Sequence, residues 1–340
     1  MKKMRPYDQQ GVDEITRKLP QRVQWLSWLA KQGSYIARRS NDTVNRTLIS
    51  WLMPKVPASD TPDRGVYAKD AVIDSVTGVW VRLYVPVPED NESEELPVVV
   101  YFHGGGFCVL SAADKNYDVF CRQLAKRRRA AVVSVEYRLA PEHKFPAAYD
   151  DCFAALTWLA SSEGEIFLPR NADLSRCFLM GDSAGGNIVH HVGCRVAEGT
   201  QDLGLLRIVG HVLIQPYFGG EERTASEIKL TKVPLVTLET SDWFWRAFLP
   251  LGASRDHPAA NVMGVNSHDI SAVKLPPSLV VIGGLDILRD WQQRYFEYLQ
   301  MMGKEAELLF YENAIHAFHL MPYPLSSHFI QDLSVFMDRL

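Results

Sequence analysis

The sequence has few cysteines, little excess of charge of either sign and no apolar run long enough to cross a membrane. Its five cysteines are odd in number and scattered, without a C-x-x-C pair, so we expect buried thiols in a reducing compartment. The formal net charge of -4 gives no electrostatic reason to expect nucleic acid or an anionic membrane as a partner. The basic N-terminus lacks the apolar stretch of a signal peptide, so we expect a cytoplasmic location, which can include the nucleus as well.

Sequence motifs for cofactors and metal ions are absent as well. The chain contains neither G-x-G-x-x-G nor the lysine-bearing P-loop pattern, and no H-E-x-x-H or other metal-ligand spacing. We therefore expect no cofactor and no metal. What the chain does have is 340 residues with 47% hydrophobic content, enough to bury the core of one large α/β domain.

A glycine-rich stretch at 178–186, which reads FLMGDSAGG, organises the rest of the chain. It has the form of a buried strand, a very tight turn and the start of a helix. Small residues are needed there because a strand that reverses into a helix so quickly crowds its own backbone. The pattern G-x-S-x-G holds the hydroxyl of Ser183 at the tip of the turn, as in the nucleophile elbow of α/β-hydrolases. The alternative is a glycine-rich turn with an incidental serine, and we interpret Asp182 as a turn residue.

Candidates for a base and an acid follow in the order that this elbow requires. A serine hydroxyl is a poor nucleophile near neutral pH unless a base takes its proton and a carboxylate orients that base. Asp286 comes just after the apolar run at 278–282, and His316 follows a strand at 307–311 and a short loop. The competing carboxylate and imidazoles fall within the helices expected after these strands: Asp290, His319 and His328.

Three successive glycines follow another buried strand and can present backbone N–H groups to an oxyanion. We expect Gly105 and Gly106 to donate, together with the amide of Ala184 at the elbow, and Gly104 is a further candidate. A phosphate-binding loop is the alternative, and the missing nucleotide motifs argue against it.

The first 60 residues differ from the remainder of the chain. Tryptophans and aliphatic residues share one face of an amphipathic helix, which predicts either a helix packed on the domain or a lid over an active-site mouth. We therefore divide the chain into a helical lid or cap at 1–60 and a catalytic domain at 61–340. Aromatic residues from both parts are candidates for the substrate pocket: Trp25, Trp28, Tyr35, Phe107 and Trp243.

Strand and helix patterns alternate between residue 96 and the C-terminus, which predicts a parallel sheet with helices on both faces. Apolar residues alternate with other residues at 79–85, which favours a half-exposed antiparallel edge strand.

The motifs HGGG at 103–106, GDSAGG at 181–186 and YRLAPEH at 137–143, with Asp286 and His316, resemble the hormone-sensitive-lipase-like group of α/β-hydrolases. The likeness runs from about residue 70 to the C-terminus. It implies an α/β-hydrolase fold, with a mostly parallel eight-stranded sheet, helices on both faces and a cap, and a Ser-His-Asp triad.

A closer likeness links the chain to plant carboxylesterases and their relatives, the gibberellin receptors. It is carried by FGGEERT at 218–224, RDHPA at 255–259 and the segment 285–292. In the gibberellin receptors the position of His316 is no longer histidine and the third glycine of the triplet is replaced, whereas this chain keeps both. The resemblance thus implies a carboxylesterase that hydrolyses small to medium esters through an acyl-enzyme, with a small-molecule ester as its partner. The alternative is a gibberellin-receptor-like protein that binds a small-molecule hormone and then a protein partner.

Overall fold

A single mixed sheet forms the centre of the molecule. The computed structural model describes residues 19–25, 27, 28, 32, 38, 39, 43–88 and 95–340. Nine strands in these residues pair in the order β1-β2-β3-β5-β4-β6-β7-β8-β9. Their bounds are β1 Ser59–Asp63, β2 Val66–Asp74, β3 Val79–Pro86, β4 Leu96–Phe102, β5 Ala131–Glu136, β6 Ala172–Asp182, β7 Ile208–Ile214, β8 Ser278–Leu285 and β9 Ala306–Ile315.

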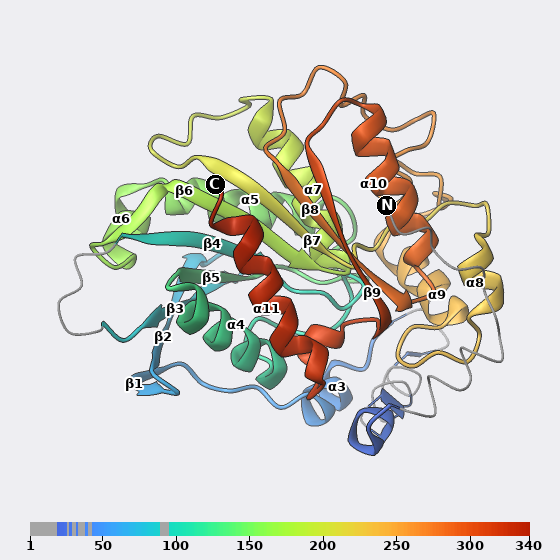
Figure 1. Ribbon diagram of the computed structural model, residues 1–340, viewed down its shortest axis with the longest axis horizontal. Helices are drawn as coiled ribbons and strands as arrows, with labels where there is room; N and C mark the ends of the chain where they lie inside the picture. Colours follow the sequence, from blue (N-terminus) through green and yellow to red (C-terminus); the bar gives the residue numbers. More distant parts are fainter. Residues whose placement is uncertain (1–18, 26, 29–31, 33–37, 40–42, 89–94) are drawn as a thin grey trace.

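Helices cover both faces of this sheet. The described helices are α3 Arg46–Leu52, α4 Lys115–Arg128, α5 Ala147–Leu159, α6 Ser162–Phe167, α7 Ala184–Ala197, α8 Ala225–Lys229, α9 Leu238–Phe248, α10 Arg289–Met301 and α11 Pro324–Met337, with a 3-10 turn η1 at Phe318–Leu320. In Figure 1, α4 and α11 lie in front of the sheet and α5 and α7 lie behind it. Helix α10 packs on β8 and β9. None of the helices in the described part is long and apolar enough to span a bilayer.

The central strands are buried on both faces, as their continuous apolar runs predict. Every residue of β4 and of β8 is buried. From β5 to β9 all neighbouring strands run parallel, and β1, β2 and β3 add antiparallel pairs on one side. The carboxyl ends of the parallel strands therefore meet at one edge of the sheet, which is where ligands bind in open α/β sheets.

Two details of the predicted sheet are wrong, although the fold class is confirmed. The sheet has nine described strands instead of eight, because the polar segment Ser59–Asp63 pairs with β2 as an edge strand. Strand β3 is antiparallel as predicted but lies inside the sheet, paired with β2 and β5. Its alternation suggested a half-exposed edge, yet six of its eight residues are buried, because β2 pairs along its outer edge and helices α4 and α5 pack on it.

Candidate active site

Ser183 lies at the turn between strand β6 and helix α7. Its backbone has φ 52° and ψ -116°, a sparsely populated conformation of the kind that costs about 1–3 kcal/mol. A Cβ on Gly185 would lie 1.9 Å from the carbonyl oxygen of Phe102, and one on Gly181 would lie 2.4 Å from the carbonyl carbon of Gly185. The turn therefore requires both glycines of the G-x-S-x-G pattern.

The structure brings His316 and Asp286 together at the ends of neighbouring strands. His316 follows β9 directly and Asp286 follows β8, and Nδ1 of the imidazole lies 2.7 Å from Oδ2 of the carboxylate. Asp286 is fully buried and accepts three further hydrogen bonds: from Gln215 Nε2 at 3.1 Å, Gln292 Nε2 at 2.9 Å and the backbone N–H of Leu288 at 3.0 Å. Four donors around one carboxylate hold it in place and leave His316 with one fixed partner.

The charge environment of His316 suits a base. Burial alone would lower the pKa of this imidazole. The negative charge of Asp286 and the hydrogen bond to it, with a smaller contribution from Asp182, raise the pKa above its ordinary value.

Three backbone N–H groups of the glycine triplet and the elbow lack a hydrogen-bond acceptor in the described part of the chain. Gly105 and Gly106 have positive φ angles of 103° and 58°, which favour glycine. The N–H groups of these two residues and of Ala184 have no acceptor within the described part of the chain. The N–H of Gly104, in contrast, donates to the hydroxyl of Tyr117 at 2.7 Å. Gly104 is therefore occupied, and the expectation that it contributes to an oxyanion site is wrong.

Asp182 has a larger role than the turn residue that the sequence suggested. Its buried carboxylate accepts from the hydroxyls of Tyr101 at 2.7 Å and Tyr117 at 3.0 Å, and from the N–H of Gly104 at 3.0 Å. Burial raises its pKa to about 6, against the opposing effect of these hydrogen bonds. Asp182 thus links the elbow by a hydrogen bond to residues 104–106, which are called the glycine loop below. A glycine at 104 is also required, because a Cβ there would lie 2.4 Å from Asp182 Oδ2.

Other supporting residues were also missed from the sequence. Gln215 and Gln292 donate to Asp286, and the hydroxyl of Tyr137 donates to the carbonyl of His103 at 2.7 Å. The rings of Tyr137 and His103 stack at 4.2 Å. Gln292 and Tyr137 lie within motifs that the resemblance singled out, which was the available signal. Gln215 had none, because its contact depends on residues far away in the chain.

Aromatic residues of helix α9 lie against the glycine loop. Phe107 is fully buried and stacks on Phe248 with centroids 3.6 Å apart. A Cβ on Gly106 would lie 2.5 Å from the ring of Phe244. Trp243, on the same helix, is 5% exposed, and the guanidinium of Arg38 lies 5.8 Å from the centre of its ring. Of the five candidate pocket residues, Phe107 and Trp243 thus belong to the aromatic layer around this loop.

The N-terminal candidates lie differently. Trp25 and Trp28 are 60% and 57% exposed, so neither is packed against the domain, whereas Val23 on the same helical segment is buried. The amphipathic pattern predicted that the face with Trp25 and Trp28 packs on the domain, whereas Val23 is the buried residue of this segment. Tyr35 lies outside the described residues.

Two of the three rival residues lie on α-helices, as the sequence predicted, and the third lies in a separate 3-10 turn. Asp290 is in the first turn of α10 and accepts from the N–H of Ser226 at 2.8 Å. His319 lies in the 3-10 turn and His328 in α11. The described residues contain no group of three or more His, Cys, Asp or Glu side chains placed to hold a metal ion.

A serine on a strained strand-to-helix turn, a buried histidine–carboxylate pair and open backbone N–H groups define an α/β hydrolase of the carboxylesterase type. The chain belongs to the α/β-hydrolase family, whose sequence model matches residues 99–320. It is similar to the gibberellin receptor GID1C of Arabidopsis thaliana, with 42% identity over 309 residues that cover 87% of this chain and 88% of the receptor. Probable carboxylesterase 6 of the same plant is 41% identical over 275 residues, 80% of each chain. Among solved structures, an esterase of Pyrobaculum calidifontis has a TM-score of 0.68 and 25% identity, and the match covers 97% of this chain and 92% of the esterase.

Proposed function

We propose that this protein is a carboxylesterase that hydrolyses small to medium carboxylic esters through an acyl-enzyme. Ser183 is the nucleophile, His316 the general base and acid, and Asp286 the carboxylate that orients the imidazole. The observation that carries the proposal is the 2.7 Å contact between His316 Nδ1 and Asp286 Oδ2, at the sheet edge where Ser183 stands on its turn. That pairing leaves Nε2 of the imidazole to take a proton from a hydroxyl.

The proposed reaction has two halves. The oxygen of Ser183 attacks the ester carbonyl carbon while His316 takes its proton, and the oxyanion accepts from the N–H groups of Gly105, Gly106 and Ala184. The carbon–oxygen bond to the alcohol then breaks, and His316 gives the alcohol its proton. Water attacks the acyl-serine with the same base, and the carboxylic acid leaves with Ser183 restored.

The proposal is tested with p-nitrophenyl acetate and Ser183→Ala. We expect the wild-type protein to turn the ester over, and the variant to lose at least about 10⁴-fold in kcat, because it lacks the proposed nucleophile. Far-UV circular dichroism and the Tm of both proteins provide the control for folding. Equal turnover by the two proteins would contradict the proposal.

A second candidate function is a receptor that binds a small carboxylate hormone. The 42% identity to a gibberellin receptor over 88% of its length favours it. Against it, the chain retains His316 and Gly106, which binding alone does not need. Calorimetry with gibberellin on the preparation used for the ester assay separates the two functions. We expect turnover without tight hormone binding, and tight binding without turnover would reverse the assignment.

The N-terminal segment is proposed to be a cap, and Arg46 in α3 supports this assignment. Its guanidinium donates to the carbonyl of Cys108, just beyond the glycine loop, and to the carbonyl of Ala140 at 2.7 Å. The same guanidinium pairs with Glu142. Helix α3 is therefore connected to the segment that follows the glycine loop.

The proposed reaction needs only an ester and water, so the proposal includes no cofactor, metal ion or nucleic acid. All five cysteines are buried and unpaired. Free thiols suit the reducing cytoplasm, the proposed location, and the nucleus equally.

A further inference from the structure

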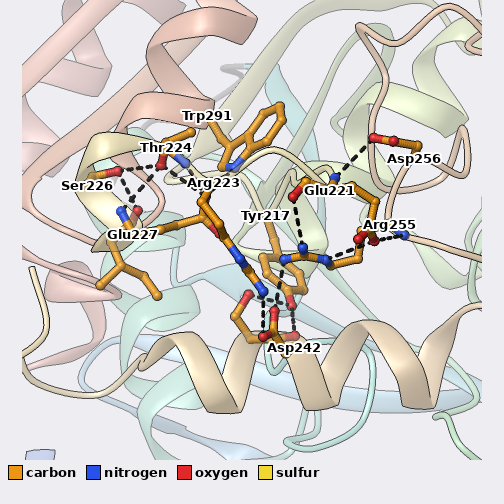
Figure 2. A network of polar contacts seen from close by, with 12 residues as sticks. Tyr217, Glu221, Arg223, Thr224, Ser226, Glu227, Asp242, Arg255, Asp256 and Trp291 are labelled. Atoms are coloured by element: carbon orange, nitrogen blue, oxygen red, sulfur yellow. Dashed lines mark hydrogen bonds and ion pairs between the residues drawn. The ribbon is translucent and has the colours of Figure 1, made fainter. Parts of the chain in front are cut away.

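Two arginines form ion pairs with one carboxylate on helix α9. Asp242 accepts from Arg223 Nη2 at 2.6 Å through one oxygen and from Arg255 Nη1 at 2.9 Å through the other. The two arginines come from separate loops, one before α8 and one after α9, and they reach Asp242 together (Figure 2). About a quarter of the Asp242 side chain is exposed, and Arg255 is 13% exposed, so the pairs are partly shielded from water.

Each arginine is also held from its other side. Arg223 Nη1 donates to Glu227 at 3.1 Å, and Glu227 in turn accepts from the indole N–H of Trp291 at 3.0 Å. Arg255 pairs with Glu221 through Nε at 3.3 Å. Because the guanidinium groups are fixed at both ends, they lose little side-chain entropy when they bind Asp242. The three residues Arg223, Asp242 and Arg255 are called the Asp242 clamp below.

The helix that the clamp holds is in contact with the candidate active site. Phe244, two residues after the clamped aspartate, packs against Gly106. The hydroxyl of Tyr217 donates to the carbonyl of Ser241 in α9 at 2.7 Å, and its N–H donates to the carbonyl of Ser183 at 2.8 Å. Helix α9 therefore borders both the glycine loop and the elbow.

The glycine loop has its own supports, which do not involve α9. The N–H of Gly104 donates to Tyr117 and Asp182, and the carbonyl of His103 accepts from Tyr137. A displacement of α9 would therefore leave the N–H groups of Gly105 and Gly106 largely in place. It would move the aromatic side chains of α9 that lie beside them, such as Phe244.

We propose that the Asp242 clamp determines acyl-chain specificity. It fixes the position of α9, whose aromatic side chains then contact the acyl group of the ester, and so controls how well longer acyl chains are bound. This inference rests on the proposed esterase function. Asp242 is a positioning residue, because it acts through Phe244 and its neighbours on α9.

The test compares Asp242→Asn with Glu222→Gln on p-nitrophenyl acetate and p-nitrophenyl hexanoate. Glu222 lies in the same loop as Arg223 and forms a two-bonded pair with Arg294 of α10 instead of a residue of α9, so it is a matched control. For Asp242→Asn we expect KM for the hexanoate to rise about tenfold through lost apolar contact, with kcat and KM for the acetate within about twofold of wild type. The control should leave both esters unchanged. An equal effect on both esters, or none, would overturn the proposal.

A readout that does not require turnover is the hydrogen exchange of the peptide that spans α9. We expect faster exchange in Asp242→Asn than in wild type, and a smaller increase in Arg255→Gln, which leaves Arg223 paired. In a background of Arg223→Gln and Arg255→Gln, Asp242→Asn should add nothing. Unchanged exchange would refute the clamp even if esters are hydrolysed. Faster exchange in a protein that turns over neither ester would refute the esterase function and, with it, the role in specificity, while the contact with α9 would stand.

Discussion

Asp286→Asn tests the candidate triad most sharply, because it removes a charge and keeps nearly the same shape. In the wild-type protein Oδ2 accepts three hydrogen bonds, from His316, Gln215 and Gln292, whereas Oδ1 accepts one from the N–H of Leu288. An asparagine must place its NH₂ group at one of these two positions.

The contacts determine which position that is. An NH₂ group at the Oδ2 position would face three donors, whereas at the Oδ1 position it would face only the N–H of Leu288. We therefore expect the side-chain oxygen of the asparagine to stay beside His316 and to keep accepting from Nδ1. The tautomer of the imidazole is then preserved, and the variant loses the charge of the carboxylate alone.

The expected loss in kcat depends on whether the variant keeps the tautomer of the imidazole. A unit charge at about 4 Å from another is worth about 4 kcal/mol at an effective dielectric constant near 20. Losing that stabilisation of the imidazolium in the transition state corresponds to a fall of about 10³-fold in kcat, since each 1.4 kcal/mol is about tenfold. If the imidazole instead adopted the wrong tautomer, the loss would be nearer 10⁴-fold, as in serine proteases.

The pH dependence gives a second and independent measure. His316 must be neutral to act as a base, so activity falls when the pH drops through its pKa, which lies above its ordinary value in the wild-type protein. Without the charge of Asp286, burial dominates and the pKa falls, so the acid limb of the profile should move to lower pH.

The assay is the profile of kcat/KM for p-nitrophenyl acetate between about pH 5 and about pH 9. Asp290→Asn is the control, because Asp290 is the rival carboxylate and bonds to Ser226 instead of His316. An Asp286→Asn variant within tenfold of wild type, an acid limb that does not move, or an equal loss in Asp290→Asn would each refute the reasoning.

Two further predictions concern the glycine loop and its contact with the N-terminal segment. Gly106→Ala should lower kcat for p-nitrophenyl acetate about 10²-fold, because its Cβ would meet the ring of Phe244 at 2.5 Å and displace an oxyanion donor. Gly199→Ala, with a similar φ of 66° and nothing within 4 Å of the new Cβ, is the matched control and should keep wild-type kcat. Arg46→Met removes the hydrogen bonds to the carbonyls of Cys108 and Ala140. It should reduce the free energy of unfolding in urea by about 2 kcal/mol. An unchanged urea midpoint would show that this contact does not anchor the segment.

Much of the candidate site could be predicted from the sequence, because each residue follows a feature that local pattern reveals. Ser183, Asp286 and His316 each come at or just after the end of a strand, and parallel strands bring such positions to one edge. The structure brings His316 and Asp286 into contact as expected. Their catalytic roles remain predictions for the experiments above.

The features that the sequence did not predict depend on contacts between residues far apart in the chain. Asp182 bonds to Tyr101 from 81 positions away, and no local signal separates such a carboxylate from one in an ordinary turn. Strand β1 was missed because its residues are polar and it is defined only by its pairing with β2. The amphipathic pattern around Trp25 indicated a packed face, whereas the described contact with the loop beyond the glycines is made by Arg46, a polar residue outside that pattern.

Within the described residues, the strained turn at Ser183 is held by backbone hydrogen bonds and by its neighbours, and no hydrogen bond of its hydroxyl contributes. Its N–H donates to the carbonyl of Ile214 at 2.9 Å, and its carbonyl accepts from the N–H of Tyr217 at 2.8 Å. Asp182 is anchored by three donors on one side, and Gly185 packs on a strand backbone on the other. Two backbone hydrogen bonds at about 0.5–1.5 kcal/mol each are comparable to the strain of about 1–3 kcal/mol. Because none of these supports involves the side chain, Ser183→Ala should keep the fold, so a loss of turnover in that variant reports on the chemistry of the hydroxyl itself.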